Sequence, residues 1–345
     1  MPSDRTFVTE LATGLGMFGD DDLDTVIARR PSAFVSLSGQ DWDRLSELWS
    51  DHQFGAEFVG GFLNGRAFLA APDALNGRPP RIVEWTGGRR SPGDEVVPSD
   101  LRIDHVYLVS CKYLSGILHN PSPARLVDGL LSQAPVDDAR DWYERGAPLE
   151  YQELYEICVQ DELGLPKLAT AMSTTERRGL ATRLRSGWPG GAVEAYDRLC
   201  RTVSGATAEA WGAAIRAGHA ETAMWRLLRI GSAPYFVLGS NPSGAMRLRV
   251  DTPWDWRQAY RFRRLQVGPQ EGGQPRVSWS VVYEDRRTDE ERVVRGHVEI
   301  RWSHGRFAQP PEAKVYLDTP MSGLPGYYPL DDPDQPELTL WSVAR

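Results

Sequence analysis

The sequence has few of the residues that build disulfide frameworks and transition-metal sites. It contains 3 cysteines and 6 histidines in 345 residues. Cys111, Cys158 and Cys200 are widely spaced and odd in number, which excludes a CxxC metal site and indicates free thiols in a reducing compartment. A metal site built from His297 and His304 is disfavoured, because no Cys or His cluster completes a shell around them.

Long apolar runs and several nucleotide and nucleophile motifs are also missing. No apolar stretch approaches the roughly 20 residues that span a bilayer. The acidic N-terminal residues do not have the basic-then-apolar order of a signal peptide, so we expect a cytoplasmic protein without a membrane partner. The absence of a GxxxxGK[ST] loop and of a GxSxG elbow disfavours an ATP-driven translocase and a serine hydrolase.

The overall charge is acidic but unevenly distributed. The formal net charge of −8 argues mildly against a nucleic-acid partner, because a protein that binds a polyanion usually shows a basic face. The segment 247–264, however, carries six arginines against Asp251 and Asp255. Local charge therefore matters more here than the sum.

Hydrophobic periodicity predicts an α+β chain in four successive parts. Helical spacing over 38–52 and 54–75 precedes short strand-like runs, and a helix follows from Ser122. Helical periodicity then dominates up to about Ile230, and alternating patterns after Gly231 predict an antiparallel sheet. The expected parts are N-terminal helices with a mixed αβ core (1–136), a helical segment (137–230), a β-rich recognition domain (231–330) and an acidic tail (331–345).

One strand-like run, 106–113, ends with a serine and a lysine on the same face. Ser110 and Lys112 share that face because the side-chain period of a strand is two. A hairpin turn near Asp104 would bring Asp100 opposite Ser110, since cross-strand neighbours lie within about 5.5 Å. Asp104 itself is a poorer partner, because it lies roughly 26 Å from Lys112 along an unbroken strand. The alternative is a lysine that merely snorkels at the end of a strand.

This pattern resembles the PD-(D/E)XK nuclease superfamily, which has the restriction-endonuclease-like fold. Pro98-Ser99-Asp100 stands for the family's first acidic element, and Ser110-Cys111-Lys112 stands for Asp/Glu-x-Lys at the end of an apolar strand. The sequence departs from the family at Ser110, where an acid is usual, and is more similar to subgroups that have serine there. The resemblance covers roughly residues 41–135 and implies a core of helix, three strands, helix and strand.

In such serine-containing subgroups, a neighbouring helix supplies the missing acid. Glu57, on the helix before the strands, and Asp128, on the helix after them, are the two candidates, and we favour Glu57. The resemblance implies that Asp100 and Glu57 hold Mg²⁺ or Mn²⁺, with the carbonyl of Cys111 as a further oxygen ligand. Lys112 would then serve the attacking water and the transition state. Together with Ser110, these residues form the expected catalytic set.

Two further segments bear on the function. Glu312-Ala-Lys314 is a literal Glu-x-Lys, but two prolines precede it and its apolar residues follow it, so we interpret it as the start of a strand. Elsewhere arginines alternate with aromatic residues, a pattern that suits contacts with phosphates and bases. The expected nucleic-acid-binding residues are Arg257, Arg261, Arg263, Arg264, Arg301 and Arg306.

The resemblance implies a Mg²⁺-dependent endonuclease, a hydrolase of DNA phosphodiester bonds that functions in restriction or antiviral defence. A homodimer is expected because one active site cuts one strand, and a defence-system partner protein is a further expectation. Two alternatives remain open at this point. The chain is either such an enzyme or a catalytically silent nuclease-fold protein that binds nucleic acid or a partner protein, and a scaffold without a nucleic-acid role is a third reading. The choice between DNA and RNA is not decided by the sequence.

Overall fold

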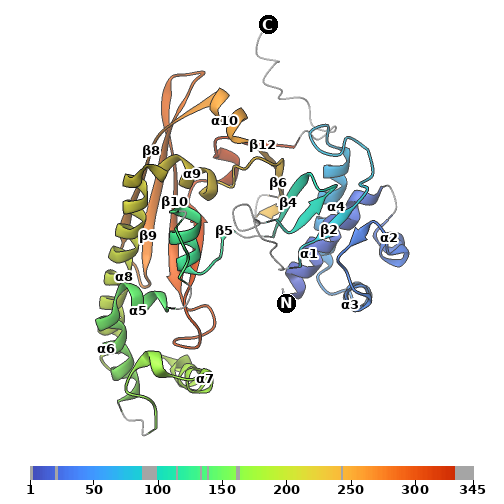
Figure 1. Ribbon diagram of the computed structural model, residues 1–345. Helices are drawn as coiled ribbons and strands as arrows, with labels where there is room; N and C mark the ends of the chain where they lie inside the picture. Colours follow the sequence, from blue (N-terminus) through green and yellow to red (C-terminus); the bar gives the residue numbers. More distant parts are fainter. Residues whose placement is uncertain are drawn as a thin grey trace. The chain divides into compact units, whose positions relative to one another are not determined.

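The computed structural model describes residues 3–19, 22–87, 99–113, 116–132, 134–137, 140–160, 164–241 and 244–330. Two compact units emerge, shown in Figure 1. Unit 1 comprises Met1–Ser115, Arg229–Gln258 and Met321–Arg345, and unit 2 comprises Gly116–Leu228 and Ala259–Pro320. Unit 2 is thus formed by two insertions into unit 1, and the segment expected to be rich in β-structure, 231–330, contributes strands to both. Pro98 and the acidic tail lie outside the described residues.

Unit 1 is built on a mixed, seven-stranded sheet in the order β1-β2-β3-β4-β6-β7-β12. The pairs β1–β2 and β4–β6 are parallel, and the other neighbours are antiparallel. A parallel pair requires a crossover connection, and the first insertion of unit 2 lies within the one between β4 and β6. The strands are Phe34–Val35 (β1), Val83–Trp85 (β2), Leu101–Ile103 (β3), Tyr107–Tyr113 (β4), Tyr235–Asn241 (β6), Gly244–Val250 (β7) and Tyr327–Pro329 (β12).

Three helices of unit 1 begin after a residue whose side chain caps them: Ser3, Asp22 and Ser38. Ser3 accepts a hydrogen bond from the amide of Thr6 at the start of the first helix. Ser38 and Asp41 form a reciprocal capping box, in which Ser38 is the N-cap. The helices are Asp4–Leu15 (α1), Leu23–Arg29 (α2), Gly39–Ser50 (α3) and Gly55–Ala70 (α4), and Pro253–Ala259 (α10) links β7 to β8.

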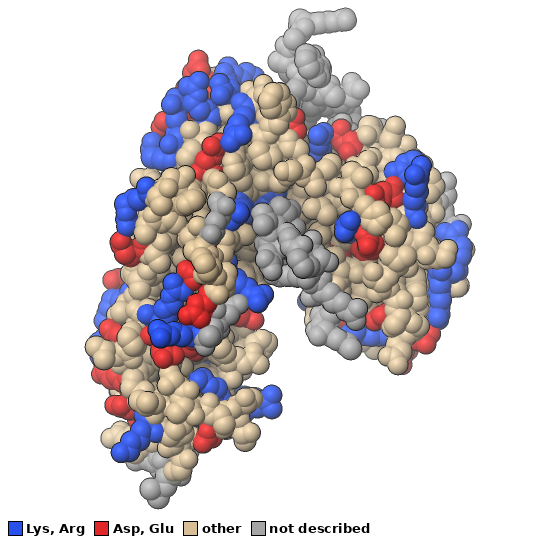
Figure 2. All heavy atoms as spheres, viewed as in Figure 1, with Lys and Arg blue, Asp and Glu red and all other residues tan. Residues whose placement is uncertain are grey.

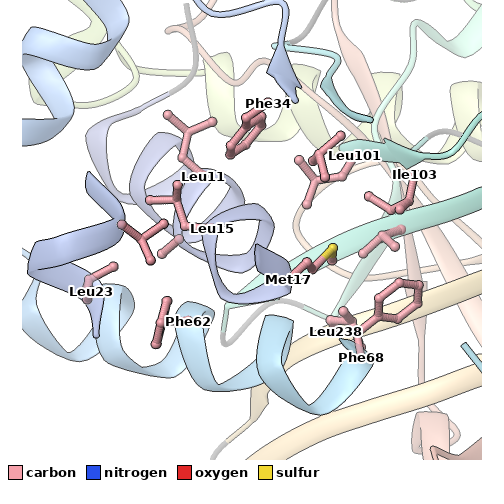
Figure 3. Close-up of a cluster of buried hydrophobic side chains, with 14 of the residues drawn as sticks. Leu11, Leu15, Met17, Leu23, Phe34, Phe62, Phe68, Leu101, Ile103 and Leu238 are labelled. Carbon is pink, nitrogen blue, oxygen red and sulfur yellow. The ribbon is translucent and has the colours of Figure 1, made fainter. Parts of the chain in front are cut away.

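The core of unit 1 lies between the sheet and the helices α1 and α4. Leu11 and Leu15 of α1 and Phe62 and Phe68 of α4 lie close to one another in this core, with Leu238 of β6 in the same cluster (Figure 3). Burying a side chain of this size contributes roughly 1.5–3 kcal/mol. Packing against the sheet therefore fixes both helices relative to β4.

Glycines let α1 and α4 approach unusually closely. A Cβ atom on Gly65 would lie 2.0 Å from the carbonyl oxygen of Thr13, and one on Gly16 would lie 2.1 Å from that of Phe62. Gly61 and Gly65 of α4 therefore have a packing role, because only glycine leaves room for backbone contact with α1. This contact sets the height of α1 above the sheet.

Unit 2 combines an antiparallel sheet in the order β5-β11-β10-β9-β8 with a set of helices. Figure 1 shows the long helix α8 running along the strands, and it packs on β8 and β9. Glu312-Ala-Lys314 begins β11, which confirms its interpretation as a strand start. The strands are Ile117–His119 (β5), Tyr260–Gln270 (β8), Arg276–Asp285 (β9), Glu290–Arg301 (β10) and Glu312–Leu317 (β11), and the helices are Trp142–Gly146 (α5), Pro148–Val159 (α6), Thr174–Arg183 (α7), Ala192–Ala214 (α8) and Ala220–Leu227 (α9).

The structure confirms the predicted fold class at the level of its architecture. The chain is α+β, with a mixed sheet and helices, a helical middle segment, and an antiparallel sheet formed mainly by its later strands. In the described part of the chain, no helix has both the length and the apolar character needed to cross a membrane.

Candidate functional site

The hairpin predicted between Asp100 and Lys112 is present. Strands β3 and β4 pair antiparallel with Leu101 opposite Val109, and the turn falls where it was expected. Asp104 has a left-handed backbone with φ of 52°. Its carboxylate accepts hydrogen bonds from the amides of Arg81 and Ile82, at 2.7 and 3.1 Å. Asp104 therefore anchors the turn, far from the other end of the hairpin.

Asp100 lies at the open end of this hairpin, opposite Ser110. Its amide donates a hydrogen bond to the carbonyl of Val109 in β4 at 2.8 Å. The next contacts with β4 come from the carboxylate of Asp100. Its Oδ2 accepts hydrogen bonds from the hydroxyl of Ser110 at 3.1 Å and from the amide of Cys111 at 2.6 Å. The carboxylate is thus held by two donors of β4 at the place where the strands separate.

Lys112 follows Ser110 on the same face of β4 and is half-buried. Burial lowers the pKa of its ammonium group to about 8, and the nearby Arg229 guanidinium adds to this effect. Asp100 and Glu10 act in the opposite direction, because a carboxylate favours the charged lysine. Lys112 therefore has neighbours of both charge signs. Its neutral form becomes populated once the pH rises slightly above neutral.

The second acid of this cluster is Glu10 of α1. Its side chain is buried, and Oε2 accepts a hydrogen bond from the indole Nε1 of Trp85 at 2.6 Å. Burial and, to a smaller extent, the Asp100 carboxylate raise the pKa of Glu10 to about 8, against the opposing effects of Trp85 and Lys112. Glu10 and Asp100 are thus close enough to repel each other when both are ionised.

Glu10 is a candidate site residue that the sequence patterns above do not single out. One signal could have found it: Glu10 interrupts the apolar stripe that Phe7, Leu11 and Gly14 form at helical spacing. A carboxylate on the buried face of an amphipathic helix has a large desolvation penalty and needs a partner or a function.

The acids expected on the neighbouring helices have other partners. Glu57 of α4 is buried and forms an ion pair with Arg5 of α1, with 2.9 Å between Oε1 and Nε. Asp128 forms an ion pair with Arg145 inside unit 2. In the described residues Glu10, rather than either of these, is the acid whose charge acts on Asp100 and on Lys112.

A buried arginine completes the cluster. Arg229, just before β6, is 3% exposed. Its Nη1 donates to the hydroxyl of Ser110 at 3.1 Å and to that of Tyr235 at 2.5 Å. The cluster therefore contains two carboxylates and two cations, and the hydroxyl of Ser110 links one of each, Asp100 and Arg229.

The cluster offers oxygen donors to a metal ion. In the described ranges, no group of three or more His, Cys, Asp or Glu residues could hold one. Mg²⁺ and Mn²⁺ need fewer protein ligands, since Mg²⁺ is usually bound by one or two carboxylates together with water and substrate phosphates. Glu10 and Asp100 provide two carboxylates whose mutual repulsion a cation would relieve. Burial raises the pKa of the Cys111 thiol and so disfavours the thiolate form that binds metal ions, while the role of the Cys111 carbonyl stays a prediction.

The arginines expected to bind nucleic acid differ in their surroundings. Arg261, Arg263 and Arg264, here called the β8 arginines, are exposed, and Figure 2 shows blue side chains gathered over the end of unit 2 where β8 begins. They also form ion pairs with Glu284 or Glu291. The β8 arginines are thus accessible to a phosphate chain, with acids interspersed.

The three other predicted arginines have different environments. Arg306 lies over the ring of Trp188, with 4.0 Å from its guanidinium carbon to the ring centroid, and donates to the carbonyl of Leu184. Arg301 is half-buried and pairs with Glu299. Arg257 is exposed on α10. Arg306 and Arg301 are therefore engaged within unit 2 to a greater extent than the β8 arginines.

The cluster of Glu10, Asp100, Ser110, Lys112 and Arg229 can perform acid–base and electrostatic chemistry. It combines carboxylates that suit a hard cation with a lysine whose pKa lies near the physiological range. Comparison with protein-family models, curated proteins and solved structures found no match to this chain.

Proposed function

We propose that the chain is a metal-dependent endonuclease that hydrolyses phosphodiester bonds in DNA. The observation that carries this proposal is the convergence at the open end of the β3–β4 hairpin. There Asp100 is bound by two donors of β4, Lys112 follows on the same strand, and Glu10 acts electrostatically on both. Two carboxylates beside a lysine are the groups that metal-assisted phosphodiester hydrolysis needs.

The fold proposed for unit 1 is restriction-endonuclease-like. Helix α1, strands β2 to β4 and the parallel strand β6 supply the first helix, the three strands and the returning strand of the PD-(D/E)XK pattern, and the helices between β4 and β6 belong to the inserted unit 2. Ser110 stands where that family usually has an acid. In this proposal Glu10 of the first helix supplies the carboxylate instead.

Each residue has a defined role in the proposed reaction. A Mg²⁺ or Mn²⁺ ion held by Glu10 and Asp100 would polarise the scissile phosphate and lower the pKa of a bound water. Lys112, in its neutral form, accepts a proton from the attacking water; in its charged form it stabilises negative charge on the phosphoryl oxygens. Trp85 and Ser110 hold the two carboxylates through the hydrogen bonds described above.

The β8 arginines support a nucleic acid as the substrate. Exposed arginines neutralise backbone phosphates, and the resulting attraction does not depend on sequence. Cleavage of both strands would require two copies of the site, so a homodimer is part of the proposal, as is a setting in restriction or antiviral defence with a partner protein.

A second candidate function is supported by the charges of the cluster. Lys112 and Arg229 can balance Glu10 and Asp100 without a metal ion, so the four groups form a set that is neutral overall when all are charged. A catalytically silent protein of the same fold would retain such a set for stability. It would bind nucleic acid or a partner protein without cutting.

Cleavage of supercoiled plasmid distinguishes the two candidates. We expect nicking by the wild type in Mg²⁺ or Mn²⁺ and none in EDTA, and losses of about 100-fold or more for Asp100→Ala and Lys112→Ala, in line with the usual contribution of acid–base groups. The control is Asp43→Ala, which removes an exposed carboxylate of α3. Unchanged cleavage by both site variants would refute the assignment, and DNA binding without cleavage in either metal would favour the second candidate.

A further inference from the structure

Arg229 has an unusual position for an arginine. It is almost fully buried, yet no salt bridge with a carboxylate is among its contacts in the described residues. Its Nη1 donates to two hydroxyl groups, and its Nε has no hydrogen-bond acceptor within the described part of the chain. Burying a guanidinium group with an unused donor is unfavourable. The function of Arg229 is therefore sought in its hydrogen bonds to the hydroxyl groups of Ser110 and Tyr235.

Its contact with Ser110 fixes the direction of that hydroxyl. A serine hydroxyl has one proton to donate and two lone pairs to accept with. Because Arg229 can only donate, it occupies a lone pair of Ser110, and the serine proton is left for Oδ2 of Asp100. The order of donation therefore runs from Arg229 through Ser110 to Asp100.

The consequence is a carboxylate with one oxygen occupied and the other open. Oδ2 of Asp100 accepts from both Ser110 and Cys111. No hydrogen-bond donor to Oδ1 is present in the described residues. The two bonds at Oδ2 therefore leave Oδ1 as the oxygen that is open to a ligand.

We propose that Arg229 is a positioning residue that holds Asp100, through Ser110, in the orientation that binds the metal ion. This inference rests on the proposed function, because it assigns Asp100 as a metal ligand. It also gives a physical reason for serine at position 110. An ionised acid there has no proton to donate to Oδ2 of Asp100 and would pair with Arg229 instead, so the chain of donors would be broken.

Binding of Mn²⁺, measured by electron paramagnetic resonance on the full-length protein without DNA, tests the inference. We expect Arg229→Met and Ser110→Ala each to weaken Mn²⁺ binding by about 10- to 100-fold, as is usual when a partner of a metal ligand is removed. The double variant should be no weaker than either single variant, because both changes interrupt one path. Arg229→Lys should recover part of the affinity, since an ammonium group can still donate to Ser110.

The matched control is Arg226→Met. Arg226 lies three residues earlier and donates to the backbone carbonyls of Gly129 and Leu130 in unit 2, so its loss should leave Mn²⁺ binding unchanged. Circular dichroism establishes that each variant is folded. If Arg229→Met does not fold, Ser110→Ala, which removes only a hydroxyl, carries the test.

A further variant gives a result that a merely structural role does not predict. Ser110→Glu restores the acid that the PD-(D/E)XK pattern usually has. By this inference it should bind Mn²⁺ more weakly than the wild type, although it adds a carboxylate.

Two outcomes overturn different claims. Equal Mn²⁺ affinity in the wild type, Arg229→Met and Ser110→Ala, or tighter binding by Ser110→Glu, would overturn the role of Arg229 alone. A folded wild type that binds no Mn²⁺ would overturn both this role and the metal site of the proposed function.

Discussion

The Glu10→Gln substitution separates a catalytic site from a structural network of ion pairs, because the two assign opposite signs to its effect on stability. If Glu10 serves mainly to neutralise Lys112, its removal should destabilise the fold. If Glu10 is held in a buried, acidic site for the sake of a metal ion, its removal should stabilise the fold of the metal-free protein and remove activity. Glutamine retains an oxygen that can accept the hydrogen bond from Trp85.

The expected size of the effect follows from the pKa of Glu10, which burial and Asp100 raise from 4.5 to about 8. A tenfold difference in acidity corresponds to about 1.4 kcal/mol, so an ionised Glu10 destabilises the fold by at most about 5 kcal/mol. Between the two pKa values the folded state holds a proton that the unfolded state has lost, so stability falls as pH rises. The gain from glutamine should therefore be near zero below about pH 4, about 2 kcal/mol near pH 6, and largest above about pH 8.

Urea unfolding in EDTA, followed by tryptophan fluorescence across this pH range, measures the gain. Glu57→Gln is the matched control: it neutralises a buried glutamate of α4 that is paired with Arg5, so it should leave the unfolding free energy unchanged or lower it. A loss of stability in Glu10→Gln at high pH would refute the argument, as would a gain that does not grow with pH.

Two further predictions concern the surroundings of Lys112 and the surface of unit 2. A Cβ atom on Gly239 of β6 would lie 1.7 Å from the carbonyl oxygen of Lys112, so Gly239→Ala should shift β4 and reduce plasmid cleavage about 10-fold or more. Gly60→Ala is the control, because a Cβ atom on Gly60 of α4 would meet open space, and this variant should keep the wild-type rate. Equal rates for the two variants would contradict the role given to the contact between Gly239 and Lys112. Replacing the three β8 arginines by alanine should lower the slope of log affinity for DNA against log salt by up to about 3, measured by fluorescence anisotropy. The single variant Arg30→Ala, on the surface of unit 1, should leave that slope unchanged, and an unchanged slope in the triple variant would exclude the β8 arginines from DNA contact.

Local patterns predict the hairpin of the site because all its determinants lie close together in the sequence. The alternation of 106–113 placed Ser110 and Lys112 on one face, and the turn near Asp104 brought Asp100 opposite them. These relations depend only on strand geometry.

Residues brought to the site by packing were not predictable in the same way. Glu10 reaches it because Gly16 and Gly65 allow α1 to lie close to α4, and no short-range pattern encodes that contact. Arg229 is separated from Ser110 by 119 residues. The division of the chain into two units was not predictable either. Strands β6 and β8 both have the sequence pattern of a strand, but that pattern does not say which sheet a strand joins.

Cleavage of supercoiled plasmid in Mg²⁺ by Glu10→Ala and Glu57→Ala, compared with the wild type, tests the central claim most directly. The account predicts that the wild type cuts, that Glu57→Ala keeps its rate within a few-fold, and that Glu10→Ala loses about 100-fold or more, because Glu10 is the acid acting on Asp100 and Lys112. Full activity in Glu10→Ala would contradict the account, and so would the absence of cleavage by the folded wild type in both Mg²⁺ and Mn²⁺.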